Sequence, residues 1–128
     1  MKSDRTAIES YTDLLVWQRA MDLVDEVYDL ARCFPSDERF DLRSQVRRAA
    51  VSVPSNIAEG WGRSSKKDFV RFLYIARGSL YEVETQMRIA QRQGYIEVTA
   101  LKRLVEHSHE LSRMLLGLIR SVQKQASR

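Results

Sequence analysis

The stretch AAVSVPSNIAEGWGRSSKKDF, at residues 49–69, decides how this chain divides into helices. Its apolar residues follow a helical spacing, yet Pro54 lies in the middle of them. Val53 and Ile57 flank the proline and share one helical face, so the helical phase continues across it. A proline inside a helix removes one backbone hydrogen bond and clashes with the preceding turn, at a cost of about 3 kcal/mol. The stretch therefore predicts a helix that is kinked at Pro54, rather than an active-site loop.

Polar residues beside this proline are placed to satisfy the backbone groups that a kink exposes. Ser52, Ser55 and Asn56 all carry side chains that form local hydrogen bonds to the backbone. Gly60 and Gly62 are expected to end the helix. The alternative is a true break, at which Ser52 caps a new short helix.

Four segments carry apolar residues at alternating steps of three and four, which is the pattern of an amphipathic helix. The first seam is predicted at Leu14, Trp17, Met21, Val24, Tyr28 and Ala31. The second is predicted at Leu42, Val46, Ala49, Ala50, Val53 and Ile57. The third is predicted at Phe69, Phe72, Leu73, Ala76, Leu80, Val83, Met87 and Ala90. The fourth is predicted at Leu101, Leu104, Leu111, Leu115, Leu118 and Val122.

Helix ends are marked by residues that cap backbone groups. Thr12 or Asp13 is expected to cap the first helix. Ser65 and Asp68, three residues apart, resemble a capping box at the start of the third helix, and Gly94 is expected to close that helix.

No segment alternates with a period of two, so the fold class is predicted to be all-α. Short connections between four long helices imply antiparallel neighbours. The predicted architecture is an up-down four-helix bundle whose second helix is kinked at Pro54. Residues 1–12 are expected to form a flexible N-terminal segment, and residues 13–125 the bundle, as one domain.

The composition is that of a globular, helix-rich chain. Of 128 residues, 44% are hydrophobic and 30% are charged, with five glycines and two prolines. No apolar run approaches the roughly 20 residues of a membrane span, and the N-terminus lacks the apolar core of a signal peptide. The single cysteine, Cys33, cannot form an internal disulfide. These features indicate a reduced, cytoplasmic setting and no membrane partner.

Charge is distributed unevenly along the chain. Residues 1–42 carry five basic and ten acidic side chains, whereas residues 43–77 carry eight basic and two acidic ones. A concentrated basic segment is typical of a surface that binds RNA or DNA. Near Trp61, cations, an aromatic ring and a helix N-terminus together favour phosphate binding and base stacking. Phosphate contacts are expected from Arg47, Arg63, Lys66, Lys67 and Arg71; the alternative is a solvated turn with a packed tryptophan.

The faces opposite the second and third seams differ from those of an ordinary surface helix. The face of the second helix holds mostly small residues, and that of the third is apolar with Gly78 in its middle. We expect a second buried face that contacts another copy of the chain. Glu59 and Glu82 lie on these faces near Arg48 and Arg71, which favours ion pairs between subunits. The predicted oligomer interface comprises Arg48, Ser52, Ser55, Glu59, Ile75, Gly78 and Glu82; the alternative is a scatter of single surface aromatics.

Catalytic and metal-binding constellations are weak in this sequence. A di-metal carboxylate bundle needs two Glu-x-x-His motifs. Glu106 and His109 form one, and His107 is the only other histidine. Glu106 and His109 also lie away from the leucine seam of the fourth helix. Nothing near Cys33 favours a reactive thiolate, so we expect no enzyme activity, no metal and no cofactor.

Two strings in the chain resemble a known family. SVPSNIAEG at residues 52–60 and IARGSLYEVET at residues 75–85 are similar to the bacterial family named after proteins encoded in 23S rRNA intervening sequences. The resemblance covers about residues 13–125. It implies an antiparallel four-helix bundle that assembles as a ring-like homopentamer and has no agreed biochemical activity. The family is also similar in fold to the accessory variability proteins of diversity-generating retroelements, which are basic pentamers that bind nucleic acid and a reverse transcriptase.

These observations lead to two main functional hypotheses. The first is a non-enzymatic, cytoplasmic homo-oligomer that binds RNA or DNA through its basic segment. The second is a protein-interaction scaffold in which the arginines form ion pairs between subunits. A metal-dependent oxidase is a third hypothesis, which the iron and manganese content of the purified protein tests.

Overall fold

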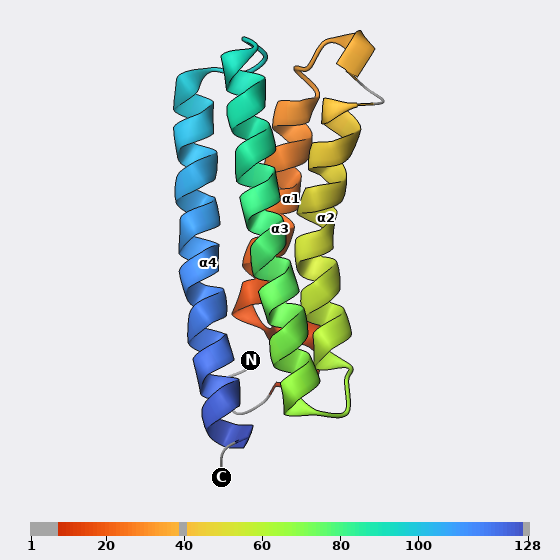
Figure 1. Ribbon diagram of the computed structural model, residues 1–128, viewed down its shortest axis with the longest axis vertical. Helices are drawn as coiled ribbons and strands as arrows, with labels where there is room; N and C mark the ends of the chain where they lie inside the picture. Colours follow the sequence, from red (N-terminus) through yellow and green to blue (C-terminus); the bar gives the residue numbers. More distant parts are fainter. Residues whose placement is uncertain (1–7, 39–40, 127–128) are drawn as a thin grey trace.

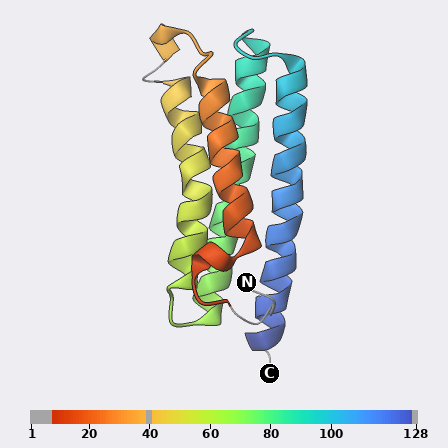
Figure 2. The same ribbon diagram turned by 180° about the vertical axis from the view of Figure 1, so that it is seen from behind.

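The computed structural model describes residues 8–38 and 41–126, and within them the chain is helical, with no strand. The long helices are α1 (Leu15–Ala31), α2 (Leu42–Trp61), α3 (Lys66–Arg92) and α4 (Val98–Ala126). Two short 3-10 helices, η1 (Tyr11–Asp13) and η2 (Ser36–Glu38), lie before α1 and before α2. Figures 1 and 2 show each long helix running opposite to the next one along the chain. The all-α four-helix bundle predicted from the sequence is therefore confirmed.

The core of α2 and α3 follows the predicted seams. Every residue of the α2 seam is buried, and so is the α3 seam apart from Phe69, which is partly buried against the core. Two polar groups join the core, Ser79 on α3 and Ser108 on α4. Because both helices have one clearly dominant apolar face, periodicity alone was enough to find it.

The predicted seam of α1 is correct only in part, because Leu14 and Ala31 are buried but the middle of the buried face differs. The buried residues of this helix are Val16, Ala20, Leu23, Val27 and Ala31. Met21 is exposed, and Trp17, Val24 and Tyr28 are only partly buried. The helix carries two neighbouring apolar faces, and both satisfy a step of three or four residues. The face turned to the core carries valine, alanine and leucine. The bulkier Trp17, Met21 and Tyr28 lie at the edge of the core beside α2, where large amphipathic rings stay partly exposed.

The seam of α4 needs one correction. Ile119 is buried in the core, whereas the predicted Leu118 is only partly buried. The two positions are neighbours in the sequence, so a rotation of about 100° separates the predicted face from the observed one at this point. Ser108 also lies on the buried face, between Leu104 and Leu111.

Helix α2 is continuous through Pro54, so it is not broken into two helices at Ser52. Asn56 donates its side-chain amide to the backbone oxygen of Ser52 at 2.8 Å and to the Ser52 hydroxyl oxygen at 2.9 Å. The Ser52 hydroxyl also lies 2.9 Å from the hydroxyl of Ser79 on α3. The polar residues beside the proline therefore tie α2 to itself and to α3.

Gly60 does not end α2 as predicted, because the helix continues to Trp61 and Gly62 follows as the cap. A Cβ atom at Gly60 would lie 2.7 Å from the Cβ of Phe72, which is far inside the contact distance of two carbons. The glycine therefore allows α3 to approach α2 closely at the end of the bundle where the two helices are joined.

The remaining helix ends agree with the sequence in part. Ser65 caps α3 by accepting a hydrogen bond from the backbone nitrogen of Asp68 at 3.1 Å, and Gly94 follows α3 with a φ of 82°. The first cap differs, because Ser10 and Asp13 form a capping box on η1 rather than on α1. Of the predicted flexible segment at residues 1–12, residues 1–7 lie outside the described residues, and η1 begins within the rest.

Candidate nucleic-acid interface

Four of the predicted phosphate-binding residues meet where α2 turns into α3. Arg63 follows the end of α2, Lys66 and Lys67 open α3, and Arg71 lies one turn further along. All four side chains are exposed. We call this group of four the basic corner. It lies at the lower end of the bundle in Figure 1, the end at which α4 also terminates.

The four cations differ in how strongly the chain already holds them. Arg63 pairs with Glu59 at 3.2 Å, and Arg71 lies 3.6 Å from Asp68. Both guanidinium groups also lie near the ring of Phe72, at 4.8 and 4.7 Å from its centroid. Lys66 and Lys67 have no ion pair or hydrogen bond within the described part of the chain. Within the described residues, these two ammonium groups can therefore meet a phosphate without breaking another side-chain contact.

Two surface hollows border the basic corner, and Lys66 takes part in both. The first, of about 320 Å³, lies between the α2–α3 turn and the last turns of α4. The second, of about 550 Å³, is lined by Lys66, Lys67, Val70, Gln123 and Ala126. An extended chain of phosphates fits a shallow channel of this kind better than a compact metabolite does.

Trp61 is less available for base stacking than its sequence position indicates. It is partly buried, and its ring packs edge-on against Phe69, with centroids 6.1 Å apart and planes at 84°. One side of the ring still lines the first hollow. The observed role of Trp61 is to pack against the core at the end of the bundle, so its contribution to a ligand is limited to the wall of that hollow.

Arg47 does not join the basic corner. It lies sixteen residues before Arg63 on α2, which corresponds to about 24 Å along the helix. Its guanidinium group stacks over the ring of Tyr28 at 4.8 Å, and its Nε atom is buried. The structure therefore places Arg47 on the α1–α2 side of the bundle. Its proposed phosphate contact stays a prediction that is separate from those of the other four.

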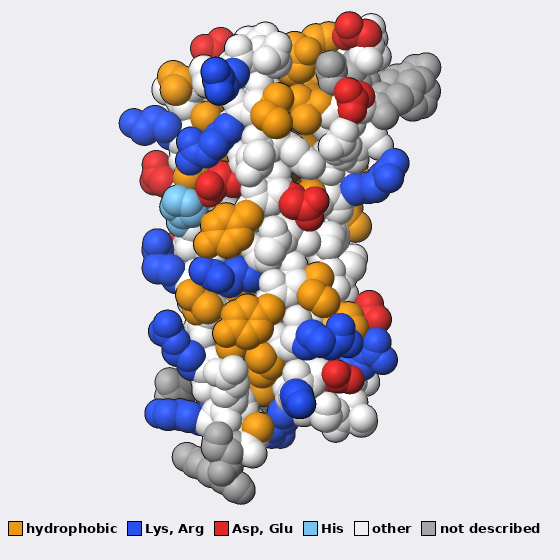
Figure 3. Space-filling model, in the orientation of Figure 1, with side chains coloured by type: hydrophobic (Ala, Val, Ile, Leu, Met, Phe, Trp, Pro, Cys, Tyr) orange, Lys and Arg blue, Asp and Glu red, His pale blue; other side chains and the backbone are white. Residues whose placement is uncertain are grey.

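The predicted oligomer interface lies on the outer faces of α2 and α3. On α3 the exposed apolar residues are Tyr74, Ile75, Tyr81 and Ile89, with exposed fractions of 40 to 49%. Figure 3 shows hydrophobic surface running down the middle of this side of the molecule. Glu82 is exposed, Gly78 has open space around it, and Arg48 donates to the Ser44 hydroxyl at 3.2 Å. Ser52 is partly buried and bonded to Ser79, so it is held mainly by its own chain.

Sequence reasoning missed the contribution of α4 to the basic corner. Gln123, Gln125 and Ala126 line the hollows beside Lys66, and Lys124 belongs to the same turn. Figure 3 shows Lys and Arg side chains along the α4 side of the molecule as well as at the lower end. An up-down topology places the end of α4 at the same end as the α2–α3 turn. That rule was available from the sequence and would have pointed to Lys124.

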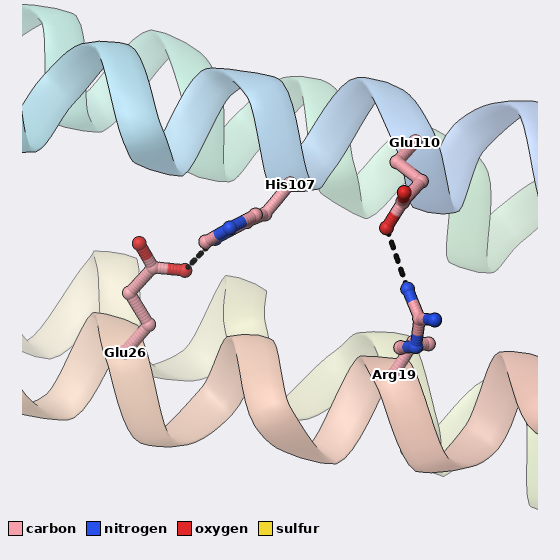
Figure 4. A network of polar contacts seen from close by, with 4 residues as sticks. All are labelled: Arg19, Glu26, His107 and Glu110. Atoms are coloured by element: carbon pink, nitrogen blue, oxygen red, sulfur yellow. Dashed lines mark hydrogen bonds and ion pairs between the residues drawn. The ribbon is translucent and has the colours of Figure 1, made fainter.

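A different polar network joins α1 to α4 on the other side of the bundle (Figure 4). The Nδ1 atom of His107 lies 2.8 Å from the carboxylate of Glu26, and Arg19 pairs with Glu110 at 2.6 Å. His109 turns to the opposite neighbour, where its Nε2 atom lies 2.7 Å from Glu84 on α3. The two histidines therefore bridge α4 to different helices, as expected for residues two apart. They do not converge on one site.

Metal-binding and membrane-spanning features are absent from residues 8–38 and 41–126. Within this part of the chain, no group of three or more His, Cys, Asp and Glu side chains is arranged to hold a metal ion. None of the helices described there is long and apolar enough to cross a membrane.

The fold and the basic corner define a small antiparallel four-helix-bundle protein with a group of exposed cations at one end. The chain belongs to the family of 23S rRNA-intervening sequence proteins, whose sequence model matches residues 12–117. This confirms the resemblance seen in the sequence. No protein of curated function matches the sequence.

A solved structure shares the fold. It is the crystal structure of a protein of unknown function from the S23 ribosomal protein family of Bacteroides thetaiotaomicron VPI-5482. The two chains superpose with a TM-score of 0.75 and are 23% identical. The match covers 82% of this chain and 98% of the other. Neither the family description nor this relative identifies an enzymatic activity.

Proposed function

We propose that this protein is a non-enzymatic, cytoplasmic homo-oligomer, a pentamer by family resemblance, that binds RNA or DNA through its basic corner. The observation that carries the proposal is the state of Lys66 and Lys67, which are exposed and have no ion pair within the described residues. An unpaired surface cation releases counterions from a polyanion without losing an existing contact, and this release is the main source of sequence-independent affinity.

Self-association strengthens this binding. One copy offers only four cations at the corner, and two of them are shared with Glu59 and Asp68. Weak phosphate contacts made by several linked copies add up to a much higher avidity than one copy has. The family name associates these proteins with the genes of 23S rRNA, and structured RNA is therefore the first ligand to test.

A pair of matched double variants tests the proposed site. Lys66→Ala/Lys67→Ala removes the two unpaired cations of the basic corner. Lys102→Ala/Arg103→Ala removes the same charge from exposed residues of the first turns of α4, at the opposite end of the bundle. Fluorescence anisotropy with labelled structured RNA and with duplex DNA measures the affinity of each protein over a series of salt concentrations.

The corner variant is expected to bind at least about tenfold more weakly than the control variant. Each lost phosphate contact lowers the slope of log K against log salt by about 0.9 on a duplex, so the loss of two contacts lowers it by about 1.8 for each copy that touches the ligand. Equal affinities for the two variants would show that binding, if present, follows net charge and does not use the corner.

The second candidate is a protein-interaction scaffold. It is favoured by the exposed apolar residues of α3 and by the ion pairs that already hold Arg63 and Arg71. Under this hypothesis, Gly78→Leu or Arg48→Ala dissociates the oligomer, while the wild-type protein binds no nucleic acid at low salt. Binding of RNA or DNA that depends on Lys66 and Lys67 would exclude the scaffold as the whole function.

A further inference from the structure

Three α1 residues that the sequence analysis assigned to the core instead line a hollow on the surface of the bundle. Trp17, Met21 and Val24 of α1 and Val51, Pro54 and Ala58 of α2 form a shallow hollow of about 330 Å³. Nearly all of its walls are apolar. A hollow lined by Tyr28 and Arg48 continues it towards the start of α2, with Val51 shared between the two. We call this surface the α1–α2 groove.

The outer face of α3 has the opposite shape. Tyr74, Ile75, Tyr81 and Ile89 project from it as exposed bulky side chains, and we call this face the α3 ridge. Gly78 lies in the middle of the ridge, and a Cβ atom there would meet nothing within 4 Å of its own chain. A glycine inside a helix costs about 0.5–1 kcal/mol relative to alanine. A glycine at this position leaves room for the backbone of another helix to approach the ridge closely.

Charges on the two surfaces are arranged in opposite order. Arg48 and Glu59 lie on α2, eleven residues apart, and Arg71 and Glu82 lie on α3, also eleven residues apart. Eleven residues span about 16 Å and return to nearly the same helical face. Each surface therefore carries one positive and one negative side chain at matching separation.

The hydrogen bond between Ser52 and Ser79 shows which residues of α2 and α3 lie at the same level, or height, along the bundle axis. Since α2 and α3 are antiparallel, Arg48 and Glu82 lie on the same side of this contact, four and three residues from it. Glu59 and Arg71 lie on the other side, seven and eight residues from it. At both heights the charge on α2 is thus opposite to the charge on α3.

We infer that the α3 ridge of one copy docks into the α1–α2 groove of a second copy that points in the same direction. This inference rests on the homo-oligomer proposed above and adds the two surfaces that meet. In this arrangement Glu82 of one copy faces Arg48 of the next, and Arg71 faces Glu59. The bulky side chains of the α3 ridge enter the hollow of the α1–α2 groove, and each of the two charge pairs joins a cation to a carboxylate.

The charge order excludes the inverted arrangement of the same two surfaces. If the second copy pointed the other way, Glu82 would face Glu59 and Arg71 would face Arg48, and such like-charge contacts are strongly unfavourable. The groove and the ridge are different surfaces on each copy, so the contact is heterologous. Repeated contacts of this type produce a ring when the rotation closes. The existing pairs of Glu59 with Arg63 and of Arg71 with Asp68 are exposed and therefore weak enough to be exchanged.

Charge reversal tests the pairing directly. The variants are Arg48→Glu, Glu82→Arg, the double variant Arg48→Glu/Glu82→Arg, and an equimolar mixture of the two single variants. Arg103→Glu and Glu97→Arg are the matched controls. Both residues are exposed, and these substitutions change the charge by the same amounts outside the groove and the ridge. Sedimentation velocity measures the assembly state over a range of protein concentrations, and circular dichroism checks that each variant is folded.

Each single reversal is expected to weaken assembly at least about tenfold. The double variant is expected to regain it, since it restores opposite charges at every contact. The mixture is expected to regain it only in part, because only unlike neighbours pair favourably and a ring of five contains at least one contact between like variants. Assembly of Glu82→Arg at the wild-type strength, or single variants that the double variant does not rescue, would overturn the docking inference while leaving a homo-oligomer in place. A wild-type chain that stays monomeric would overturn both, and the anisotropy test of Lys66 and Lys67 would still decide nucleic-acid binding separately.

Discussion

Replacing Gly60 by alanine is expected to destabilise the bundle at the junction of α2 and α3. The new Cβ atom would lie 2.7 Å from the Cβ of Phe72 and 3.0 Å from a ring carbon of Phe69. The Phe72 atom is fixed to its backbone and has no rotamer that avoids the contact, so the two helices must separate. Overpacking of this kind costs about 1–3 kcal/mol, and the better helix propensity of alanine returns about 1 kcal/mol.

The expected net loss is therefore about 0–2 kcal/mol in the free energy of unfolding, measured by urea denaturation followed by circular dichroism at one protein concentration. Gly117→Ala is the control, because Gly117 lies exposed inside α4 with open space around it. That variant is expected to gain about 0.5–1 kcal/mol. If Gly60→Ala were as stable as Gly117→Ala, the close approach of α3 to α2 would be wrong.

Three further substitutions test how the bundle is held together. Ser65→Ala removes the side-chain cap of α3 and is expected to lower the free energy of unfolding by about 1 kcal/mol; an unchanged value would mean that water replaces the cap. Leu115→Ala removes a fully buried side chain from α4 and is expected to cost about 2–5 kcal/mol in the same denaturation assay, and a loss below 1 kcal/mol would contradict its central place in the core. Arg19→Ala breaks an ion pair with Glu110 in which both side chains are about half exposed, so the expected loss is below about 1 kcal/mol; a larger one would show that the pair orders α1 against α4.

Periodicity predicted the fold because most helices of this chain have one dominant apolar face. It failed for α1, where Val16, Leu23 and Val27 compete with Trp17, Met21 and Tyr28. Both sets satisfy helical spacing, and only the packing of α1 against α2 and α4 decides which one is buried. The same limit explains the exchange of Leu118 for Ile119 on α4.

The site was predictable only where it is local in sequence. Arg63, Lys66, Lys67 and Arg71 lie within nine residues, and one turn between two helices brings them together. Arg47 belongs to the same basic segment of the sequence, but the continuous helix α2 places it about 24 Å away. The opposite charge order of α2 and α3 depends on their relative height, which the Ser52–Ser79 contact shows and the sequence does not.

Binding of labelled structured RNA and duplex DNA to the wild-type protein at about 50 and 200 mM salt tests nucleic-acid binding most directly. An oligomer that makes 6–10 phosphate contacts is expected to lose about 10³–10⁵ in affinity between these concentrations. Tight binding at the lower salt with such a loss would support the basic corner as a nucleic-acid interface. No binding of either ligand at 50 mM salt would contradict it.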